Sequence, residues 1–427
     1  MAKTEELTDG IADFLTQMHE GRTRPRPRIR SVEQRELTMP FISVDDHLCE
    51  PPDAFVGRLP RKFEDLTPRV VVGDDGCDYW TFEDERVAIG GANVAAGWEV
   101  EDWYHGPISL ADARPGTFDI HARIQDMNLN GAIASMGFPS MVFGFAGQLF
   151  MKLKDHDFGV AAMRAYNDWI AEGWAGPYPE RIIPCQVTWL LDACVAAQEV
   201  RRNAARGFKA VAFTENPAKL GLASIADRSW DPFLAACAET GTAINLHTGS
   251  SSEILPGGLA INGFVAAMDW LLAGQVALRF PDIKIVMAEG GIGWVPMLLD
   301  RLFYKRRHDK VPDTFHNWPG TAPTPEEVLH RNFWFTSFFD PSAIVLRTHI
   351  GVDKIMFESD YPHQDSSWPD TQAFLSSQVQ SVPQEDVDLM TWKNAANLYR
   401  LSVTPATLVA ARAQADAVTE SVRPGAE

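Results

Sequence analysis

Acidic and imidazole side chains recur in this sequence at one kind of position, at or directly after the end of a short apolar run. The first run ends in Asp45 and His47, which are two residues apart and would point to the same face of a strand. Several carboxylates cannot share a small volume unless a cation balances their charge. Carboxylate oxygen and imidazole nitrogen bind divalent metal ions, which polarise substrates or activate water. The residues placed in this way are Asp45, His47, Glu215, His247, Glu289 and Asp360.

The elements that would position these residues are eight apolar, β-branched runs separated by helical patterns. Asp or Pro begins several of the helical segments and Gly ends them, as in 192–205 and 231–240. Near-continuous apolar strands that alternate with helices are typical of a parallel (β/α)8 TIM barrel, whose functional residues lie at the carboxyl ends of the strands. The predicted strands are 41–47, 131–140, 181–187, 207–216, 241–250, 284–291, 333–339 and 354–362.

The chain outside this repeat divides into three segments. Residues 1–38 are predicted to form an N-terminal helix and an Arg-Pro arm, and residues 401–427 a C-terminal helix and tail. Within the barrel region, 39–400, residues 51–118 interrupt the alternation of strands and helices after the first strand. Its alternating residues and its turn at Asp74–Gly76 predict an antiparallel insertion over the barrel mouth.

Charge and composition exclude several classes of protein. The sequence has 38 Lys and Arg against 57 Asp and Glu, a net charge of −19, which disfavours nucleic acid and anionic membranes as partners. The uncharged stretch 127–151 contains Pro and Gly and is predicted to be a buried strand and loop, not a membrane span. Five scattered cysteines without a CxxC pair, and a charged N-terminus, predict a cytoplasmic protein.

Motifs between about Phe41 and Arg400 resemble those of the amidohydrolase-related metal-dependent family, which includes aminocarboxymuconate semialdehyde decarboxylase and related decarboxylases and hydrolases. The resemblance implies that Asp45, His47, His247 and Asp360 bind metal and that Asp360 can activate water. The motifs are VDDHLCEPPD at 44–53, RIQDMNLNG at 123–131, YNDWIAE at 166–172, GFKAVAFTENP at 207–217, LHTGSSS at 246–252, MAEGGIGWVP at 287–296, ESDYPHQDSSWP at 358–369 and NAANLYR at 394–400.

Two departures from the family pattern add carboxylates. Many members have two His on strand one, where this chain has Asp45 and His47, and many have a His after strand six, where this chain has Glu289. Glu289 is therefore predicted as a metal ligand, directly or through water, and as a catalytic residue. Such oxygen-rich sites suit Fe or Mn, although Zn also accepts Asp and His. Glu215 occupies the place of a carboxylate that bridges two metals in the wider superfamily, so one or two ions are predicted.

Two further residues complete the predicted site. His363, three residues after Asp360, is predicted to shuttle protons, and Glu50 to orient a ligand such as His47.

The resemblance and the ligand set leave three functions open. The first is a metal-dependent hydrolase or nonoxidative decarboxylase of a small carboxylate or amide, although a decarboxylase needs a proton donor other than the missing His. The second is a carboxylate-bridged Fe or Mn oxygenase that hydroxylates a small acid. The third is a partner subunit of a hetero-oligomeric enzyme, suggested by the Arg-Pro arm at 21–30. A small-molecule substrate and a homo- or hetero-oligomer are predicted.

Overall fold

The strands of the barrel follow the predicted runs. The computed structural model describes residues 27–32, 37, 39–251, 254–256, 258–308 and 318–403. Each of the eight apolar runs contains a strand, and all the paired barrel strands are parallel. The strands are β1 (Phe41–His47), β5 (Ala132–Phe138), β6 (Ile182–Ile183), β7 (Cys185–Gln186), β8 (Ala210–Thr214), β9 (Ala243–His247), β10 (Ile285–Ala288), β11 (Phe333–Ser337) and β12 (Ile355–Phe357).

The strands form two arcs that join into a (β/α)8 barrel, as predicted. One arc has the order β1-β5-β6 and the other β12-β11-β10-β9-β8-β7. Pro184 divides one predicted run into β6 and β7, because proline has no N–H for the ladder. At the other junction, the Asp360 N–H donates to the Asp45 carbonyl at 3.0 Å and the His47 N–H donates to the Tyr361 carbonyl at 2.7 Å. The segment after β12 therefore closes the ring against β1.

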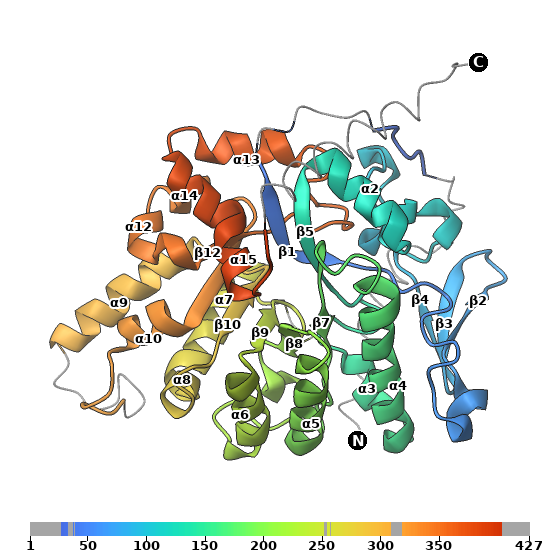
Figure 1. Ribbon diagram of the computed structural model, residues 1–427, viewed down its shortest axis with the longest axis horizontal. Helices are drawn as coiled ribbons and strands as arrows, with labels where there is room; N and C mark the ends of the chain where they lie inside the picture. Colours follow the sequence, from blue (N-terminus) through green and yellow to red (C-terminus); the bar gives the residue numbers. More distant parts are fainter. Residues whose placement is uncertain are drawn as a thin grey trace.

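Helices surround these strands (Figure 1). Asp192 caps one of them by accepting hydrogen bonds from the N–H groups of Cys194 and Val195, and Gly241 ends another with a left-handed backbone. The predicted helices at 192–205 and 231–240 are thus confirmed. The helices are α2 (Ile120–Asn130), α3 (Gln148–Lys152), α4 (His156–Trp169), α5 (Ala193–Ala204), α6 (Asp231–Thr240), α7 (Leu259–Met268), α8 (Val276–Arg279), α9 (Trp294–His308), α10 (Pro325–Asn332), α11 (Pro341–Ile344), α12 (Arg347–Ile350), α13 (Thr371–Val379), α14 (Gln384–Asp388) and α15 (Asn394–Leu398).

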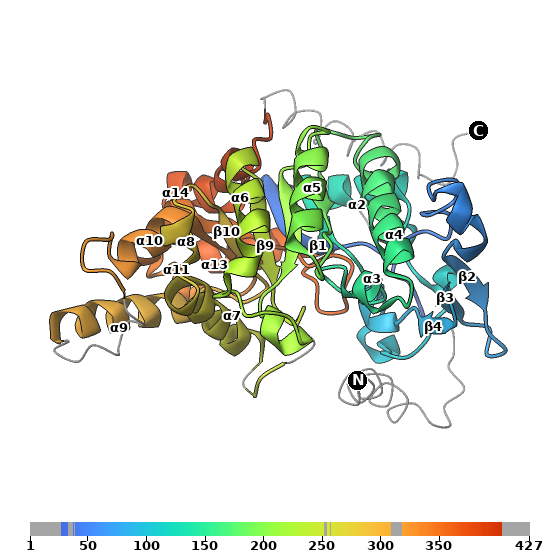
Figure 2. The ribbon, with the colours of Figure 1, turned by 90° about the horizontal axis from the view of Figure 1, so that it is seen from below.

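The predicted insertion after strand one contains an antiparallel sheet of three strands. These are β2 (Arg69–Val72), β3 (Asp78–Phe82) and β4 (Glu85–Ala88), in the order β2-β3-β4. Figure 2 shows this sheet at the opposite end of the molecule from α9. The following loop reaches the carboxyl end of β12, because the Ala96 N–H donates to the Pro362 carbonyl at 3.0 Å. This contact places part of the insertion beside the predicted site.

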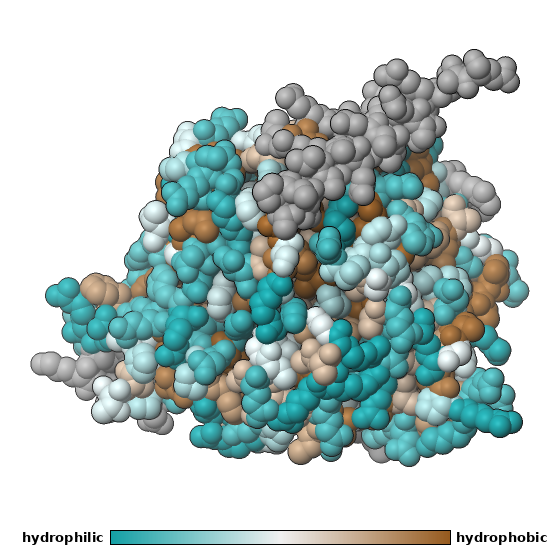
Figure 3. All heavy atoms as spheres, in the orientation of Figure 1, coloured by the Kyte–Doolittle hydropathy of each residue, from teal (hydrophilic) through white to brown (hydrophobic). Residues whose placement is uncertain are grey.

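The termini are described only in part. Arg28 and Arg30 lie along the insertion, where Ile29 pairs with Trp98. The predicted N-terminal helix and most of the C-terminal segment lie outside the described residues, so the boundaries at 38 and 401 stay predictions. Hydrophilic side chains predominate among the described residues on the face seen in Figure 3, with hydrophobic ones scattered between them.

Candidate metal centre

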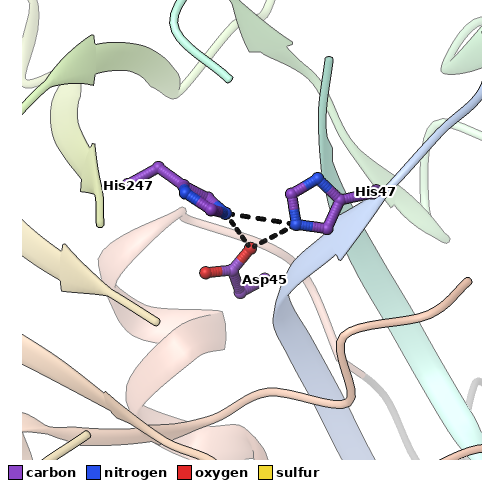
Figure 4. Close-up of side chains that lie close together, drawn as sticks. All are labelled: Asp45, His47 and His247. Atoms are coloured by element: carbon purple, nitrogen blue, oxygen red, sulfur yellow. Dashed lines mark hydrogen bonds and ion pairs between the residues drawn. The ribbon is translucent and has the colours of Figure 1, made fainter. Parts of the chain in front are cut away.

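Three side chains from two strands converge at the carboxyl end of the barrel. Asp45 and His47 are two residues apart on β1, so their side chains share the face that points inward. His247 is the last residue of β9. His47 Nε2 and His247 Nε2 are 3.1 Å apart, and Asp45 Oδ1 lies 3.6 Å from the first and 3.5 Å from the second. Figure 4 shows both imidazoles turned toward the carboxylate of Asp45.

Asp360 joins this group from the segment after β12. Its Oδ1 lies 3.3 Å from His47 Nε2. Ligands at about 2.0 to 2.3 Å from one ion are separated from one another by about 2.8 to 3.8 Å in octahedral or tetrahedral arrangements. The spacing of Asp45, His47 and His247 therefore fits three ligands of one divalent ion, and Asp360 adjoins this group through His47.

The surroundings of Asp45 also fit a cation. The side chain is buried, and neither of its oxygens has a hydrogen-bond partner among the described residues. Burial raises the pKa of Asp45 well above its ordinary value, and the charges of Asp360 and Asp46 add to the effect. An ionised carboxylate in such a place is strongly disfavoured without a counter-charge. A bound divalent ion would supply that charge.

Both imidazoles present the form that binds metal. Burial lowers the pKa of His47 and that of His247, which favours the neutral ring. The Nδ1 of His247 lies 2.8 Å from the Thr248 carbonyl oxygen. Donation of a proton from Nδ1 to that carbonyl leaves the lone pair of Nε2 facing His47 and Asp45.

Glu289 borders the same group from the end of β10. Its Oε2 lies 3.3 Å from His247 Nε2, and its side chain is 19% exposed. Its backbone has a φ of +58°. This left-handed conformation costs a non-glycine residue about 1 kcal/mol, and the Glu289 N–H donates to Thr336 Oγ1 at 3.0 Å. Burial raises the pKa of Glu289 well above its ordinary value, and the neighbouring His247 imidazole only partly opposes this.

His363 lies against both Asp360 and His47. Its Nδ1 is 3.0 Å from Asp360 Oδ1, and its ring stacks on the ring of His47 with centroids 3.8 Å apart. His47, Asp360 and His363 thus form a second group with the spacing of metal ligands, which shares His47 with the first. Burial would lower the pKa of His363, but the neighbouring Asp360 carboxylate outweighs burial and raises it.

The carboxylate of Glu215 makes its hydrogen bonds with residues outside this group. Its carboxylate accepts hydrogen bonds from Ser250 Oγ at 2.5 Å, Ser251 Oγ at 2.6 Å and the Gly249 N–H at 3.1 Å. These donors come from the loop that follows β9. The predicted bridging role therefore has no support in the contacts of the described residues, because three protein donors already occupy the carboxylate.

Glu50 also has partners other than a ligand. It accepts hydrogen bonds from the Ser140 N–H at 3.0 Å, Ser140 Oγ at 2.5 Å and Tyr166 Oη at 3.1 Å. The predicted contact with His47 is absent from the hydrogen bonds of the described chain. Glu50 instead fixes the start of the loop after β5.

That loop carries an aromatic side chain that sequence reasoning missed. The ring of Phe145 lies with its centroid 4.2 Å from that of His247 and 4.8 Å from that of His47. Phe138, at the end of β5, packs on His247 from 4.7 Å. The two rings therefore cover the imidazoles with apolar surface. Only the position of Phe138 at the end of a predicted strand could have indicated this.

A buried acidic residue was missed as well. Glu358 follows β12 and is 2% exposed, and its Oε2 accepts a hydrogen bond from the Glu289 N–H at 3.3 Å. Burial raises the pKa of Glu358 well above its ordinary value, and Asp45 and Asp360 add to this. Its place two residues before Asp360, within the predicted run 354–362, was the signal in the sequence.

A comparison with family models matches residues 107–401 to the amidohydrolase family, which is more than half of the chain. The chain belongs to the amidohydrolase family. This confirms the resemblance seen in the motifs, and the protein is a metal-dependent enzyme of that family. No curated protein matches this amidohydrolase in sequence.

Solved structures share the fold of this amidohydrolase. Amidohydrolase map2389c from Mycobacterium avium subsp. paratuberculosis K-10 is 24% identical, with a TM-score of 0.65 over 85% of this chain and 100% of the other. The 5-carboxyvanillate decarboxylase LigW from Sphingomonas paucimobilis is 18% identical, with a TM-score of 0.59 over 86% and 100%. The dihydroxybenzoic acid decarboxylase from Polaromonas sp. JS666, solved with manganese and 2-nitroresorcinol, is 16% identical, with a TM-score of 0.59 over 86% and 98%.

One segment of this amidohydrolase has the length and hydropathy of a membrane span. Among the described residues it is Leu259–Arg279, and half of its most apolar window is buried. Trp270, Leu271 and Leu272 within it belong to the hydrophobic core between barrel and helices. A core helix passes the same test, so the segment is weak support for a membrane protein. The uncharged stretch 127–151 forms the end of α2, strand β5 and most of α3.

Proposed function

We propose that this amidohydrolase is a metal-dependent nonoxidative decarboxylase of a small carboxylic acid. The observation that carries the proposal is the convergence of Asp45, His47 and His247, with Asp360 beside His47 and both Asp45 oxygens unpartnered among the described residues. In this proposal the four side chains hold one divalent ion, and Glu215 is not a ligand. When bound, the ion supplies a Lewis acid that binds an anionic substrate and stabilises negative charge.

The aromatic cover favours decarboxylation over hydrolysis. Phe138 and Phe145 pack on the imidazole rings, and their apolar surface excludes water from that side of the site. Hydrolysis needs a water molecule as nucleophile, whereas decarboxylation needs only a proton for the carbon that loses carbon dioxide. A planar acid also suits a site bounded by rings, because aromatic faces pack well on one another.

Glu289 is positioned to supply that proton. Its carboxyl borders His247 and is partly exposed, so it can take a proton from solvent and pass it to a substrate in the site. When the bond between the substrate carbon and its carboxylate breaks, carbon dioxide leaves and the electron pair stays on the carbon. The Glu289 proton then forms the new C–H bond. This assignment gives Glu289 a catalytic role in place of the predicted coordination.

The substrate class follows from this chemistry. The carbon must hold an electron pair until it is protonated, which an electron-rich ring or a conjugated acid allows. The 5-carboxyvanillate and dihydroxybenzoic acid decarboxylases that share the fold support a hydroxylated benzoate as the first substrate to test. The manganese in the second structure supports Mn²⁺ as the first metal to test.

The experiment is an assay of the Mn²⁺-loaded chain with hydroxybenzoates in D2O. We expect release of carbon dioxide and one deuterium on the carbon that carried the carboxylate. The matched control is Glu289→Gln, which keeps size but cannot donate an acidic proton. Absence of carbon dioxide release with every hydroxybenzoate, at full metal loading, would overturn the proposed substrate class.

Hydrolysis is the second candidate, favoured by the contact between Asp360 and His363. A carboxylate 3.0 Å from an imidazole is suited to remove a proton from water. Hydrolysis in H2(18)O of a small amide or lactone would place 18O in the product, without release of carbon dioxide. The hydroxylase alternative instead requires Fe or Mn and consumption of dioxygen, which an oxygen electrode measures in the same assay.

A further inference from the structure

One acidic residue lies between two proposed metal ligands in the sequence but on the opposite face of β1. Asp46 is 3% exposed, and alternation along the strand turns it away from the site that Asp45 and His47 face. Its Oδ1 accepts a hydrogen bond from Ser43 Oγ at 2.7 Å, and its Oδ2 accepts one from Ser135 Oγ on β5. The mechanism proposed above does not use this carboxylate.

The same carboxylate binds both neighbours of Asp360. Ser359 Oγ donates to Asp46 Oδ1 at 2.7 Å, and the Tyr361 N–H donates to the same oxygen at 3.2 Å. Asp360 between them has a φ of +58°, a left-handed conformation that an aspartate adopts rarely. A residue held in that region needs support from its surroundings. Asp46 supplies this support by accepting hydrogen bonds from both residues that flank Asp360.

Asp46 acts at the place where the barrel closes. The backbone bonds from the Asp360 N–H to the Asp45 carbonyl and from the His47 N–H to the Tyr361 carbonyl join the same two segments. Arg123 from α2 approaches from outside, and its Nη2 donates to the His47 carbonyl at 2.6 Å. Hydrogen bonds around Asp46 thus join β1, which carries two proposed ligands, to the segment that carries Asp360.

We propose that Asp46 is a positioning residue that holds Asp360 in its left-handed conformation, with the Asp360 carboxylate facing His47 and the metal. The inference rests on the proposed metal site. It predicts that the bonds from Asp46 to the neighbours of Asp360 control metal affinity, and that the other bonds of the same carboxylate contribute only to stability.

Two serines allow a matched test in the full-length chain. Ser359 and Ser135 are both buried and both donate to Asp46, but only Ser359 adjoins Asp360. Calorimetric titration with Mn²⁺ alone should show that Ser359→Ala weakens binding about tenfold, the size expected when a residue that orients a ligand is lost. Ser135→Ala should change the affinity less than about twofold, while both variants lower the unfolding temperature of the metal-free protein similarly.

The outcomes separate the inference from the function on which it rests. Equal losses of Mn²⁺ affinity in the two serine variants, beside normal binding by the unaltered chain, would overturn the inference alone. Failure of the unaltered chain to bind Mn²⁺ would overturn the proposed function and the inference with it. Asp46→Asn should weaken binding at least as much as Ser359→Ala, and the serine pair decides the question if that variant does not fold.

Discussion

His47 Nε2 and His247 Nε2 lie 3.1 Å apart, although 200 positions separate the two residues in the sequence. The His247 ring is oriented by the Thr248 carbonyl, so its Nε2 lone pair faces the nitrogen of the other ring. Asp45 adds a buried, unpartnered carboxylate beside both nitrogens. Two imidazole nitrogens and a carboxylate oxygen at such spacing form one face of a metal coordination shell.

The first prediction concerns the charge of Asp45. Without metal, Asp45→Asn should raise the free energy of unfolding by about 1 to 3 kcal/mol, because the folded chain must otherwise protonate this buried carboxyl or leave its charge without a partner. Addition of Mn²⁺ should stabilise the unaltered chain and leave the variant nearly unchanged. Thermal unfolding in EDTA and in Mn²⁺ measures both effects. The exposed Asp74→Asn is the control, and a metal-free Asp45→Asn that is clearly less stable than the unaltered chain would contradict the prediction.

The second prediction separates coordination from proton transfer at Glu289. Glu289→Gln should keep the metal and lower turnover by about a hundredfold, because general acid catalysis contributes at least that much. Metal content and the rate of carbon dioxide release are measured on the same preparation. Loss of metal would make Glu289 a ligand, as the sequence suggested. Unchanged metal and unchanged turnover would make it structural.

The third prediction is a pH dependence of stability at Glu50. Burial raises the pKa of Glu50 to about 7, against a partial opposing effect of its bonds from Ser140 and Tyr166. The folded chain therefore holds this proton more tightly than the unfolded chain, whose carboxyl has a pKa of about 4.3. The stabilisation is present below about pH 4 and is lost as the pH rises to about 7, a change of about 4 kcal/mol.

Glu50→Gln tests this prediction, because the amide cannot lose a proton. The free energy of unfolding, measured by urea titration between pH 4.5 and 7.5, should fall less with pH in the variant than in the unaltered chain. Parallel curves for the two proteins would show that Glu50 does not titrate in this range.

The fourth prediction concerns Glu215. Glu215→Gln should lower the free energy of unfolding by about 1 to 3 kcal/mol, because three donors from the β9 loop lose a charged acceptor. Metal stoichiometry should stay the same. Elemental analysis beside chemical unfolding checks both parts. A variant that binds half as much metal would restore the bridging role that the sequence predicted.

The sequence predicted the strands that carry the site. The run 241–250, apolar and then polar, was predicted as a barrel strand, and β9 lies in it with His247 as its last residue. The convergence of Asp45, His47 and His247 required only that the strands be parallel, whereas the place of Asp360 beside His47 also depends on the segment after β12. Pro184 lies inside another predicted run and divides it into β6 and β7, because proline has no N–H for the ladder.

The partners of buried carboxylates could not be predicted in the same way. Glu215 and Glu50 follow strands as the proposed ligands do, but loops distant in sequence supply their hydrogen-bond donors. Asp46 could be assigned to the opposite face of β1 from alternation alone, yet its bonds to Ser359 and Tyr361 depend on how the ring closes. Phe145 lies in a loop without periodicity, so no pattern indicated that its ring covers His247.

The central claim is that Asp45, His47, His247 and Asp360 hold one divalent ion. Elemental analysis of the purified full-length chain, after incubation with Mn²⁺ and removal of free metal, tests it most directly. The account predicts about one ion per chain, and almost none in His247→Ala, which removes a neutral ligand without adding charge. Absence of metal from the unaltered chain, or equal metal in the His247→Ala variant, would contradict it.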